Sequence, residues 1–240
     1  MKAVILNSGL GSRMGVYTKE HPKCMTDLSD GRSIIQRQLE LLVKCGVEDV
    51  VITTGYYDKV LVDYCHSLNL PIRYRFVKNP IYDKTNYIYS IYCAKELLKN
   101  EDILLLHGDL VFDETVLKGV LNEQRSCMSI STTLPLPEKD FKAVIDGDKI
   151  KKVGIEFFDN AVTAQPLYKL NASDWQVWLN KIVEYCEKDI RKCYAENAFN
   201  EVSNTCRIYT YDFKDELCAE VDTPEDLQIM NEKLRERAKL

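Results

Sequence analysis

The sequence contains no apolar run that approaches the roughly 18 residues of a membrane-spanning helix. It also has no basic cluster, because lysine and arginine are spread along the chain and the net charge is −5. It has no linker, internal repeat or low-complexity segment. These absences argue against direct membrane contact and against nucleic acid as a partner. They favour one domain over residues 1–240, a length that suits a single α/β domain.

Cysteine is plentiful, yet no cysteine motif for metal or redox chemistry is present. None of the nine cysteines forms C-x-x-C, and no pair combines with the three histidines at zinc-finger spacing. The count is odd and most cysteines lie in apolar segments, so we expect reduced thiols packed as small core residues. Reduced thiols predict a cytoplasmic protein, and the strand-like N-terminus is not expected to be a signal peptide.

Two common nucleotide-binding motifs are missing as well. There is no G-x-x-x-x-G-K-[ST], which excludes a P-loop kinase or NTPase. The dinucleotide fingerprint G-x-G-x-x-G is incomplete, because Met14 holds the third glycine position. No acidic residue follows the apolar run 50–52 at the distance that a ribose contact needs. A dehydrogenase is therefore disfavoured.

The N-terminal segment does carry a distinct pattern. The apolar run 3–6 predicts a buried first strand, and it leads into the turn Asn7-Ser8-Gly9-Leu10-Gly11. Arg13 follows at once and Lys23 comes ten residues later. Backbone amides in a glycine-rich turn can face anionic oxygens, and nearby cations offset the charge of a leaving pyrophosphate. The segment predicts a triphosphate-binding loop, with a plain strand-to-helix turn as the alternative.

Apolar strands and amphipathic helices alternate along the first half of the chain. We expect strands at 2–6, 50–54, 72–77 and 103–106, with helices at 33–45, 59–66 and 86–98. This alternation predicts a doubly wound α/β fold with a mostly parallel central sheet, whose ligands bind at the carboxyl ends of the strands. From 126 to 213 the pattern changes to short strands at 128–134, 142–145 and 149–155, followed by helices at 172–188 and 196–203. We expect a small α+β region of the same domain there, before a last helix at 224–239.

An aspartate stands where the fourth predicted strand leaves the core, in His107-Gly108-Asp109. A carboxylate at this edge can hold Mg²⁺ against nucleotide phosphates. The alternative for Asp109 is a loop aspartate or a helix cap. Because the chain has only three histidines, we interpret His107 as structural.

These elements together resemble a known family. The run Gly9-Leu10-Gly11-Ser12-Arg13-Met14, with Pro22-Lys23 after it, resembles the signature of nucleotidyltransferases that make nucleotide-activated sugars, alcohols and phosphonates. The usual signature begins Leu-Ala-(Ala/Gly)-Gly, and this chain differs at Asn7 and Ser8. The segment 218–227 resembles the closing motif of the same family, which implies Asp222 as a second Mg²⁺ ligand beside Asp109. Thr223 there is explained by helix capping.

The segment 79–92 narrows the resemblance to bacterial phosphocholine cytidylyltransferases and to related enzymes that activate 2-aminoethylphosphonate or phosphoglutamine. Asn86 and Ser90 are four residues apart on one helical face, where they could bind a cytosine edge. The alternative is that Thr85 caps this helix and Ser90 faces solvent or core. The segment 189–198 is most similar to the aminoethylphosphonate branch, whereas 86–90 is most similar to the phosphocholine branch. The acceptor therefore stays open.

The resemblance implies that an acceptor oxygen attacks the α-phosphorus of CTP, with Mg²⁺ as cofactor and Arg13 and Lys23 as catalytic residues. The implied partners are CTP and a small phosphorylated or phosphonate acceptor, and a homodimer is compatible with the sequence. The expected nucleotide-binding residues are Leu6, Asn7, Ser8, Gly9, Gly11, Ser12, Asn86, Ser90 and Gly108. The expected acceptor-binding residues are Tyr168, Tyr194 and Glu196. The alternatives are a sugar-1-phosphate nucleotidyltransferase using UTP or dTTP, a CTP:phosphoglutamine cytidylyltransferase, and a nucleotide-binding sensor.

Overall fold

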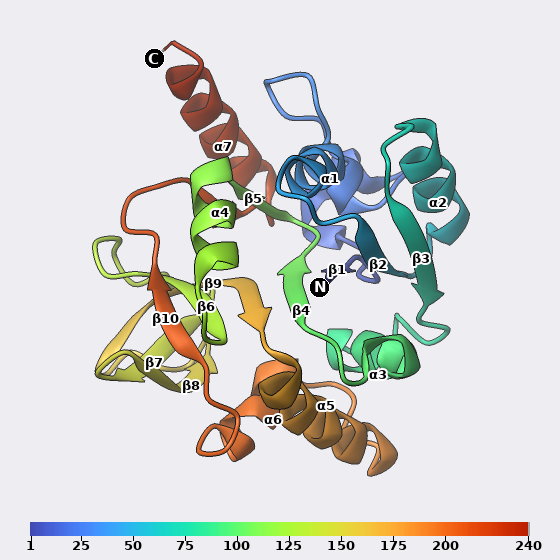
Figure 1. The fold of residues 1–240 in the computed structure, drawn as a ribbon. Helices are drawn as coiled ribbons and strands as arrows, with labels where there is room; N and C mark the ends of the chain where they lie inside the picture. Colours follow the sequence, from blue (N-terminus) through green and yellow to red (C-terminus); the bar gives the residue numbers. More distant parts are fainter. Residues whose placement is uncertain (240) are drawn as a thin grey trace.

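A computed structural model describes residues 1–239 of the chain. A nine-stranded sheet in the order β3-β2-β1-β4-β9-β6-β10-β8-β7 runs through the molecule (Figure 1). Its strands are β1 (Lys2–Leu6), β2 (Asp49–Thr54), β3 (Arg73–Lys78), β4 (Ile103–His107), β6 (Cys127–Ser131), β7 (Lys142–Asp146), β8 (Lys149–Gly154), β9 (Ala161–Leu170) and β10 (Tyr209–Asp212). A separate antiparallel pair joins β5 (Leu110–Phe112) to β11 (Cys218–Glu220).

The first four predicted strands form a continuous parallel sheet, as expected. β1 lies between β2 and β4, and Leu6 is in register with Thr53 on one side and His107 on the other. The carboxyl ends of β1 and β4 therefore lie side by side. This register places the loop after Leu6 next to the segment 107–109.

Beyond β4 the sheet is mixed. β9 pairs antiparallel with both β4 and β6, and its first residues also pair with β7. The strands β9, β6, β10, β8 and β7 therefore pair with one another in a closed ring. The sequence analysis did not predict β9, because Pro166 and Lys169 interrupt its apolar pattern. The α/β fold class is confirmed, with antiparallel pairing concentrated in the region expected to be α+β.

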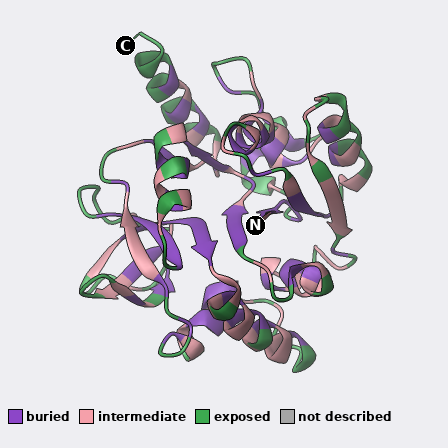
Figure 2. Ribbon diagram, viewed as in Figure 1, coloured by how far each residue is buried: buried purple, intermediate pink, exposed green. Residues whose placement is uncertain are grey.

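Helices cover both faces of the parallel half of the sheet (Figures 1 and 2). The helices of residues 1–239 are α1 (Ile34–Lys44), α2 (Asp58–Ser67), α3 (Tyr87–Leu98), α4 (Glu114–Asn122), α5 (Ala172–Glu187), α6 (Ala195–Val202) and α7 (Pro224–Arg237), of which α7 belongs to a separate apolar cluster. One apolar cluster joins Val4 of β1 to α3, α5 and α6, and a second joins Ile5 to α1, α2 and α4. Neighbouring residues of β1 point to opposite faces, as the strand period of two requires. Figure 2 shows these central strands as buried.

The helix boundaries largely follow the predicted capping signals. The Ser33 hydroxyl accepts a hydrogen bond from the Gln36 amide at 3.1 Å, and Gly46 follows α1 with a φ of +77°. At α7, Thr223 and Asp226 form a capping box. The alternative considered for α3, a cap by Thr85, does not hold: the cap is Asn86, whose side chain accepts from the Tyr87 amide.

Both tryptophans lie in the core, and six of the nine cysteines are buried as expected, whereas Cys45, Cys93 and Cys193 are partly exposed. Trp175 and Trp178 are fully buried, and their indole N–H groups donate to the carbonyls of Leu98 and Ala195. All nine cysteines are free thiols. Within residues 1–239, no helix is both long and apolar enough to span a bilayer.

Candidate functional site

A cleft of about 450 Å³ opens at the carboxyl ends of β1 and β4. The turn after β1 lines it and leads into the 3₁₀ segments η1 (Ser12–Thr18) and η2 (Lys23–Met25). Gly11 has a φ of +64°, and a Cβ atom there would lie 2.9 Å from the Cβ of Lys23. Glycine therefore lets the turn pack directly against the segment that carries Lys23. The predicted triphosphate-binding loop and the segment that carries Lys23 are therefore in direct contact.

Four charged side chains meet at one end of the cleft. The Lys23 ammonium contacts Asp109 Oδ2 and lies 2.5 Å from Asp222 Oδ1. Arg13 Nη2 lies 2.9 Å from the same Asp222 oxygen. These are the two cations and two carboxylates that the sequence analysis singled out. The structure brings all four together.

The electrostatics of this cluster follow from its partial burial. Burial alone would lower the pKa of Lys23, but attraction to Asp109 and Asp222 outweighs it and raises the pKa. Burial would raise the pKa of Asp109, but the Lys23 charge outweighs it and lowers the pKa. At neutral pH Lys23 is a cation and Asp109 is an anion. The Arg13 side chain is 63% exposed, so it is free to turn toward an incoming anion.

The β5–β11 pair explains how Asp109 and Asp222 meet, although they are far apart in the sequence. Leu110 is in register with Glu220, and the Val221 amide donates to the carbonyl of Asp109 at 3.0 Å. Each aspartate lies just outside this short ladder. The antiparallel pairing therefore brings the loop after β4 next to the residues after β11.

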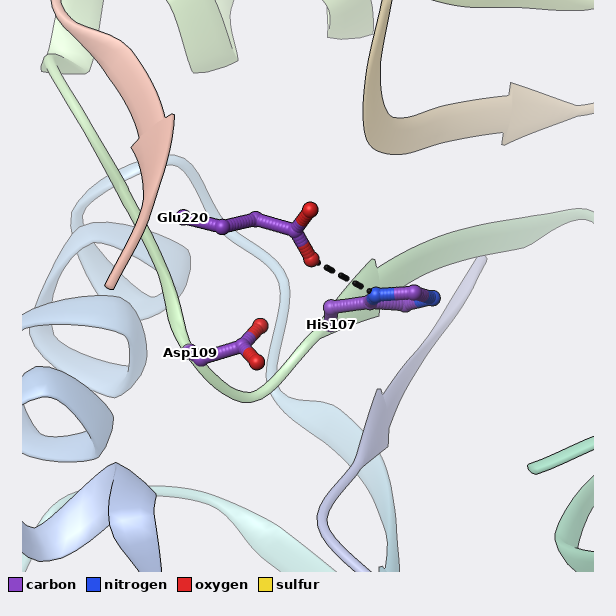
Figure 3. A group of neighbouring side chains, drawn as sticks. All are labelled: His107, Asp109 and Glu220. Carbon is purple, nitrogen blue, oxygen red and sulfur yellow. Dashed lines mark hydrogen bonds and ion pairs between the residues drawn. The ribbon is translucent and has the colours of Figure 1, made fainter. Parts of the chain in front are cut away.

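A third acidic residue, Glu220, lies beside the aspartates and pairs with His107 (Figure 3). His107 Nδ1 is 2.9 Å from Glu220 Oε1. Burial would lower the pKa of His107, but the hydrogen bond and charge of Glu220 raise it to about 8. Burial, helped by the charge of Asp109, raises the pKa of Glu220 to about 7 against the opposing effect of His107.

Sequence reasoning missed both members of this pair as site residues. His107, interpreted as structural, lines the cleft, and so does Glu220. A signal was available in the spacing, because a residue two positions from a predicted metal ligand lies near it in space. His107 precedes Asp109 by two residues, and Glu220 precedes Asp222 by two.

The carboxylates suit a divalent cation. Asp109 Oδ1 is buried, and within residues 1–239 it has no hydrogen-bond partner. Asp109 and Asp222 already converge on one cationic group, the Lys23 ammonium. Ligand atoms of His107, Asp109 and Glu220 also lie within 4.8 Å of one another. Carboxylate oxygens are ligands that Mg²⁺ accepts, so the residues present fit the metal that the sequence analysis expected.

The residues predicted to bind the nucleotide all line the cleft: Leu6, Asn7, Ser8, Gly9, Gly11, Ser12, Asn86, Ser90 and Gly108. The buried Ser90 hydroxyl accepts from Asn79 Nδ2 at 3.1 Å, which leaves its own hydrogen free to donate. Asn86 uses its side-chain oxygen to cap α3, so its amide hydrogens are the groups available to a ligand. The contacts of these residues with a nucleotide stay predictions.

The residues predicted to bind the acceptor divide into two groups. Tyr194 lines the cleft. Tyr168 and Glu196 are both 1% exposed and lie behind its wall, where the Tyr168 hydroxyl donates to Glu196 Oε1 at 2.8 Å. Tyr87, which does line the cleft, donates to the other oxygen of Glu196. Tyr168 and Glu196 therefore support Tyr87 rather than face the cleft themselves, because Tyr168 belongs to the buried strand β9.

An aromatic wall lines the cleft next to His107. The ring of Tyr87 lies 4.7 Å from His107 and 5.8 Å from Tyr194, and Phe141 lies 5.2 Å from Tyr194, all between ring centroids. Asp140 lines the cleft beside this wall, where burial and the nearby charge of Asp222 raise its pKa. Sequence analysis predicted only Tyr194 of this group.

Comparison with known proteins finds a matching family model and similar curated proteins. Residues 3–133 match the family model described as a MobA-like NTP transferase domain. The chain is 30% identical over 127 residues to a CTP:phosphoglutamine cytidylyltransferase of Campylobacter jejuni, covering 51% of this chain and 49% of that protein. It is 36% identical over 104 residues to a choline-phosphate cytidylyltransferase of Streptococcus pneumoniae, covering 43% of each. These matches thus span about half the length of the curated relatives.

A solved structure extends the likeness over nearly the whole chain. The CTP:phosphocholine cytidylyltransferase from Streptococcus pneumoniae aligns with a TM-score of 0.76 over 97% of this chain and 98% of its own, at 21% identity, which shows a shared fold. Sugar nucleotidyltransferases are among the matches too. The resemblance inferred from the signature is confirmed: the chain belongs to the MobA-like NTP transferase family.

Proposed function

We propose that the protein is a cytidylyltransferase, which transfers CMP from CTP to a small phospho- or phosphono-amino compound of the phosphocholine or 2-aminoethylphosphonate type and releases pyrophosphate. The observation that carries this proposal is the meeting of Lys23 and Arg13 with Asp109 and Asp222 beside the glycine-rich turn. The free thiols fit a reducing cytoplasm as its place of action.

The cluster supports phosphoryl chemistry because its cations have partners that a nucleotide can replace. Asp222 holds both Arg13 and Lys23. A triphosphate entering past the turn offers both cations an alternative anion of higher charge, which frees the carboxylates. Asp109 and Asp222 would then hold Mg²⁺, which supplies charge neutralisation at the phosphates when bound.

The reaction needs no general base from the protein. A phosphate or phosphonate oxygen of the acceptor is already ionised near neutral pH and attacks the α-phosphorus directly. The bond between the α-phosphorus and the bridging oxygen breaks, and pyrophosphate leaves with the electron pair. Lys23 and Arg13 stabilise the charge that develops, while the turn around Gly11 positions the phosphates.

The lining of the cleft supports the choice of substrates. Asn86 and Ser90 present hydrogen-bond donors suited to the carbonyl and ring nitrogen of cytosine. The aromatic side chains of Tyr87, Phe141 and Tyr194 line the same cleft as the carboxylates of Asp140 and Glu220. Aromatic faces and carboxylates together favour a cationic ammonium group. An amino-bearing acceptor therefore fits better than a neutral sugar.

The test is pyrophosphate release with Mg²⁺, crossing CTP, UTP, ATP and GTP with phosphocholine, 2-aminoethylphosphonate, phosphoethanolamine, phosphoglutamine and glucose-1-phosphate. We expect turnover with CTP and an amino or ammonium acceptor. Turnover with UTP and glucose-1-phosphate would assign the protein to the sugar branch instead. CTP binding without turnover on any acceptor would favour a nucleotide sensor.

A further inference from the structure

We propose that His107 and Glu220 complete, together with Asp109, a divalent-cation site that fills before the nucleotide binds and that prefers a first-row transition ion such as Mn²⁺ to Mg²⁺. This site shares Asp109 with the Asp109–Asp222 pair but lies on its other side. The inference rests on the proposed function only in taking Asp109 as a metal ligand. It concerns the protein without nucleotide.

The geometry of the three side chains matches a metal site. They come from the end of β4, the turn after it and β11, and Figure 3 shows them as neighbours, with the Glu220 carboxylate turned toward the His107 ring. In octahedral coordination with bonds of about 2.1 Å, neighbouring ligand atoms lie about 3.0 Å apart and opposite ones about 4.2 Å. His107 Nδ1 and Glu220 Oε1 are 2.9 Å apart, and the ligand atoms of all three residues lie within 4.8 Å of one another. Small side-chain adjustments suffice to bind one ion.

The two oxygens of Asp109 face different surroundings. Oδ2 contacts the Lys23 ammonium, whereas Oδ1 is buried and has no hydrogen-bond partner in the described chain. A buried carboxylate oxygen without a partner is costly. A cation bound on the side of His107 and Glu220 would satisfy this oxygen and leave Lys23 in place.

The Asp222 side is less accessible to a metal in the free protein. Asp222 Oδ1 is already held by Lys23 at 2.5 Å and by Arg13 at 2.9 Å. A divalent ion entering there would have to displace both cations or share the carboxylate with them. Before a triphosphate draws these cations away, the His107 side is therefore the favoured entry.

The nature of the ligands sets the preference among metals. Mg²⁺ prefers oxygen ligands and keeps several waters, so an imidazole nitrogen adds little to its binding. First-row transition ions accept imidazole, with affinities that rise from Mn²⁺ toward Co²⁺ and beyond. His107 is also held in place, with its ring 4.7 Å from Tyr87 and 6.2 Å from Phe141. A preoriented imidazole favours the transition ion.

The test is Mn²⁺ binding to the full chain, prepared without a polyhistidine tag and without nucleotide. Free Mn²⁺ is followed by its EPR signal, and Mg²⁺ competition gives the selectivity. We expect His107→Gln and Glu220→Gln each to weaken Mn²⁺ binding at least about tenfold, the lower end of the losses seen even for residues that only support metal ligands. Asp222→Asn should leave Mn²⁺ affinity close to that of the wild type. His66→Gln and Glu187→Gln, at exposed positions elsewhere, are the matched controls.

Co²⁺ provides a second readout, because an imidazole ligand changes its visible absorption. The spectrum of the wild type with Co²⁺ should differ from that of His107→Gln, while Asp222→Asn should match the wild type. Thermal unfolding of each variant checks that it is folded. If His107→Gln does not fold, Glu220→Gln still decides the question.

Two results would overturn the inference. One is Mn²⁺ binding that Asp222→Asn abolishes and the other two substitutions leave intact, which would place the ion on the aspartate pair alone. The other is no Mn²⁺ binding until CTP is added. Pyrophosphate release by the wild type with Mg²⁺ is measured separately. If the protein turns over substrate but does not bind Mn²⁺ in the absence of nucleotide, this inference is refuted and the proposed function stands.

Discussion

The side chain of Asn7 fills the space directly above Gly108, where a Cβ atom would lie only 1.6 Å from Asn7 Oδ1. This contact joins the turn after β1 to the loop after β4, which carry opposite charges of the site. It also gives a reason for a larger residue where the family signature has a small one. The contact depends on glycine at position 108.

We predict that Gly108→Ala forces Asn7 out of its place, because the added methyl group has no room. Overpacking of this kind costs about 1–3 kcal/mol, and CTP binding should weaken because the turn moves. Urea unfolding and CTP titration measure the two effects. The double variant Asn7→Ala, Gly108→Ala should recover stability relative to Gly108→Ala alone. Additive losses in the double variant would show that the two residues are not coupled.

Lys23 should matter for rate far more than its neighbours in the sequence. Lys23→Met removes the cation held between Asp109 and Asp222, and loss of one charge-stabilising group costs about 10²–10³ in kcat. Steady-state pyrophosphate release checks this. Lys19→Met, an exposed position in the same segment, is the control and should keep nearly full activity. Equal losses in both variants would contradict a catalytic role for Lys23.

The His107–Glu220 pair predicts how stability depends on pH. In the folded protein the pKa of His107 is raised to about 8 from an ordinary 6.5, so its stabilising contribution is complete below about pH 6.5 and is lost as the pH rises through 8. The pKa of Glu220 is raised to about 7 from an ordinary 4.5, so its contribution has the same sign and is lost as the pH rises from about 4.5 through 7. The free energy of unfolding should therefore fall between about pH 4.5 and 8.

Glu220→Gln tests the cause of that fall. Without the hydrogen bond and charge of Glu220, burial is opposed only by the attraction of Asp109 and Glu196, so the pKa of His107 should drop. The fall in stability across this window should therefore shrink. Urea unfolding at several pH values measures it. NMR titration of the three histidines, assigned with His107→Gln, follows the imidazole directly. An unchanged His107 pKa in Glu220→Gln would exclude the pair as the cause.

We predict that replacing the buried Lys142 weakens binding of the acceptor but not binding of CTP. The Lys142 ammonium donates to the carbonyls of Pro137 at 2.7 Å and Asp140 at 3.1 Å, and so fixes the loop that presents Asp140 and Phe141 to the cleft. Lys142→Met leaves these carbonyls without a hydrogen-bond donor, which should lower the free energy of unfolding by about 1–3 kcal/mol.

The kinetic signature of Lys142→Met separates positioning from simple instability. We expect a higher KM for the acceptor with little change in the KM for CTP. Lys142→Arg keeps a donor and should recover part of the loss. A uniform loss of active enzyme, with both KM values unchanged, would indicate that Lys142 acts only on stability.

The sequence predicted those elements whose local pattern of apolar residues and glycines matches their position in the fold. The run 3–6, the turn around Gly11 and the segment at Asp109 follow strand period and glycine placement, so β1, β4 and the position of Asp109 were predicted from the residues, whereas Asp222 was predicted only from the family resemblance. β9 was not, because the burial of Lys169 depends on a carbonyl of Glu123 that only the fold brings near. Tyr168 was therefore expected to line the cleft, whereas in the structure it lies behind the cleft wall. The partnership of His107 with Glu220 depends on the β5–β11 ladder, which local periodicity does not reveal.

The most direct test of the central claim is a ³¹P NMR time course of the protein with CTP, Mg²⁺ and either phosphocholine or 2-aminoethylphosphonate. The account predicts that the CTP signals decline while pyrophosphate and a new CMP-linked product appear in equal amounts, and that Lys23→Met nearly abolishes the change. CTP signals that stay unchanged with every amino acceptor, together with consumption of UTP in the presence of glucose-1-phosphate, would contradict it.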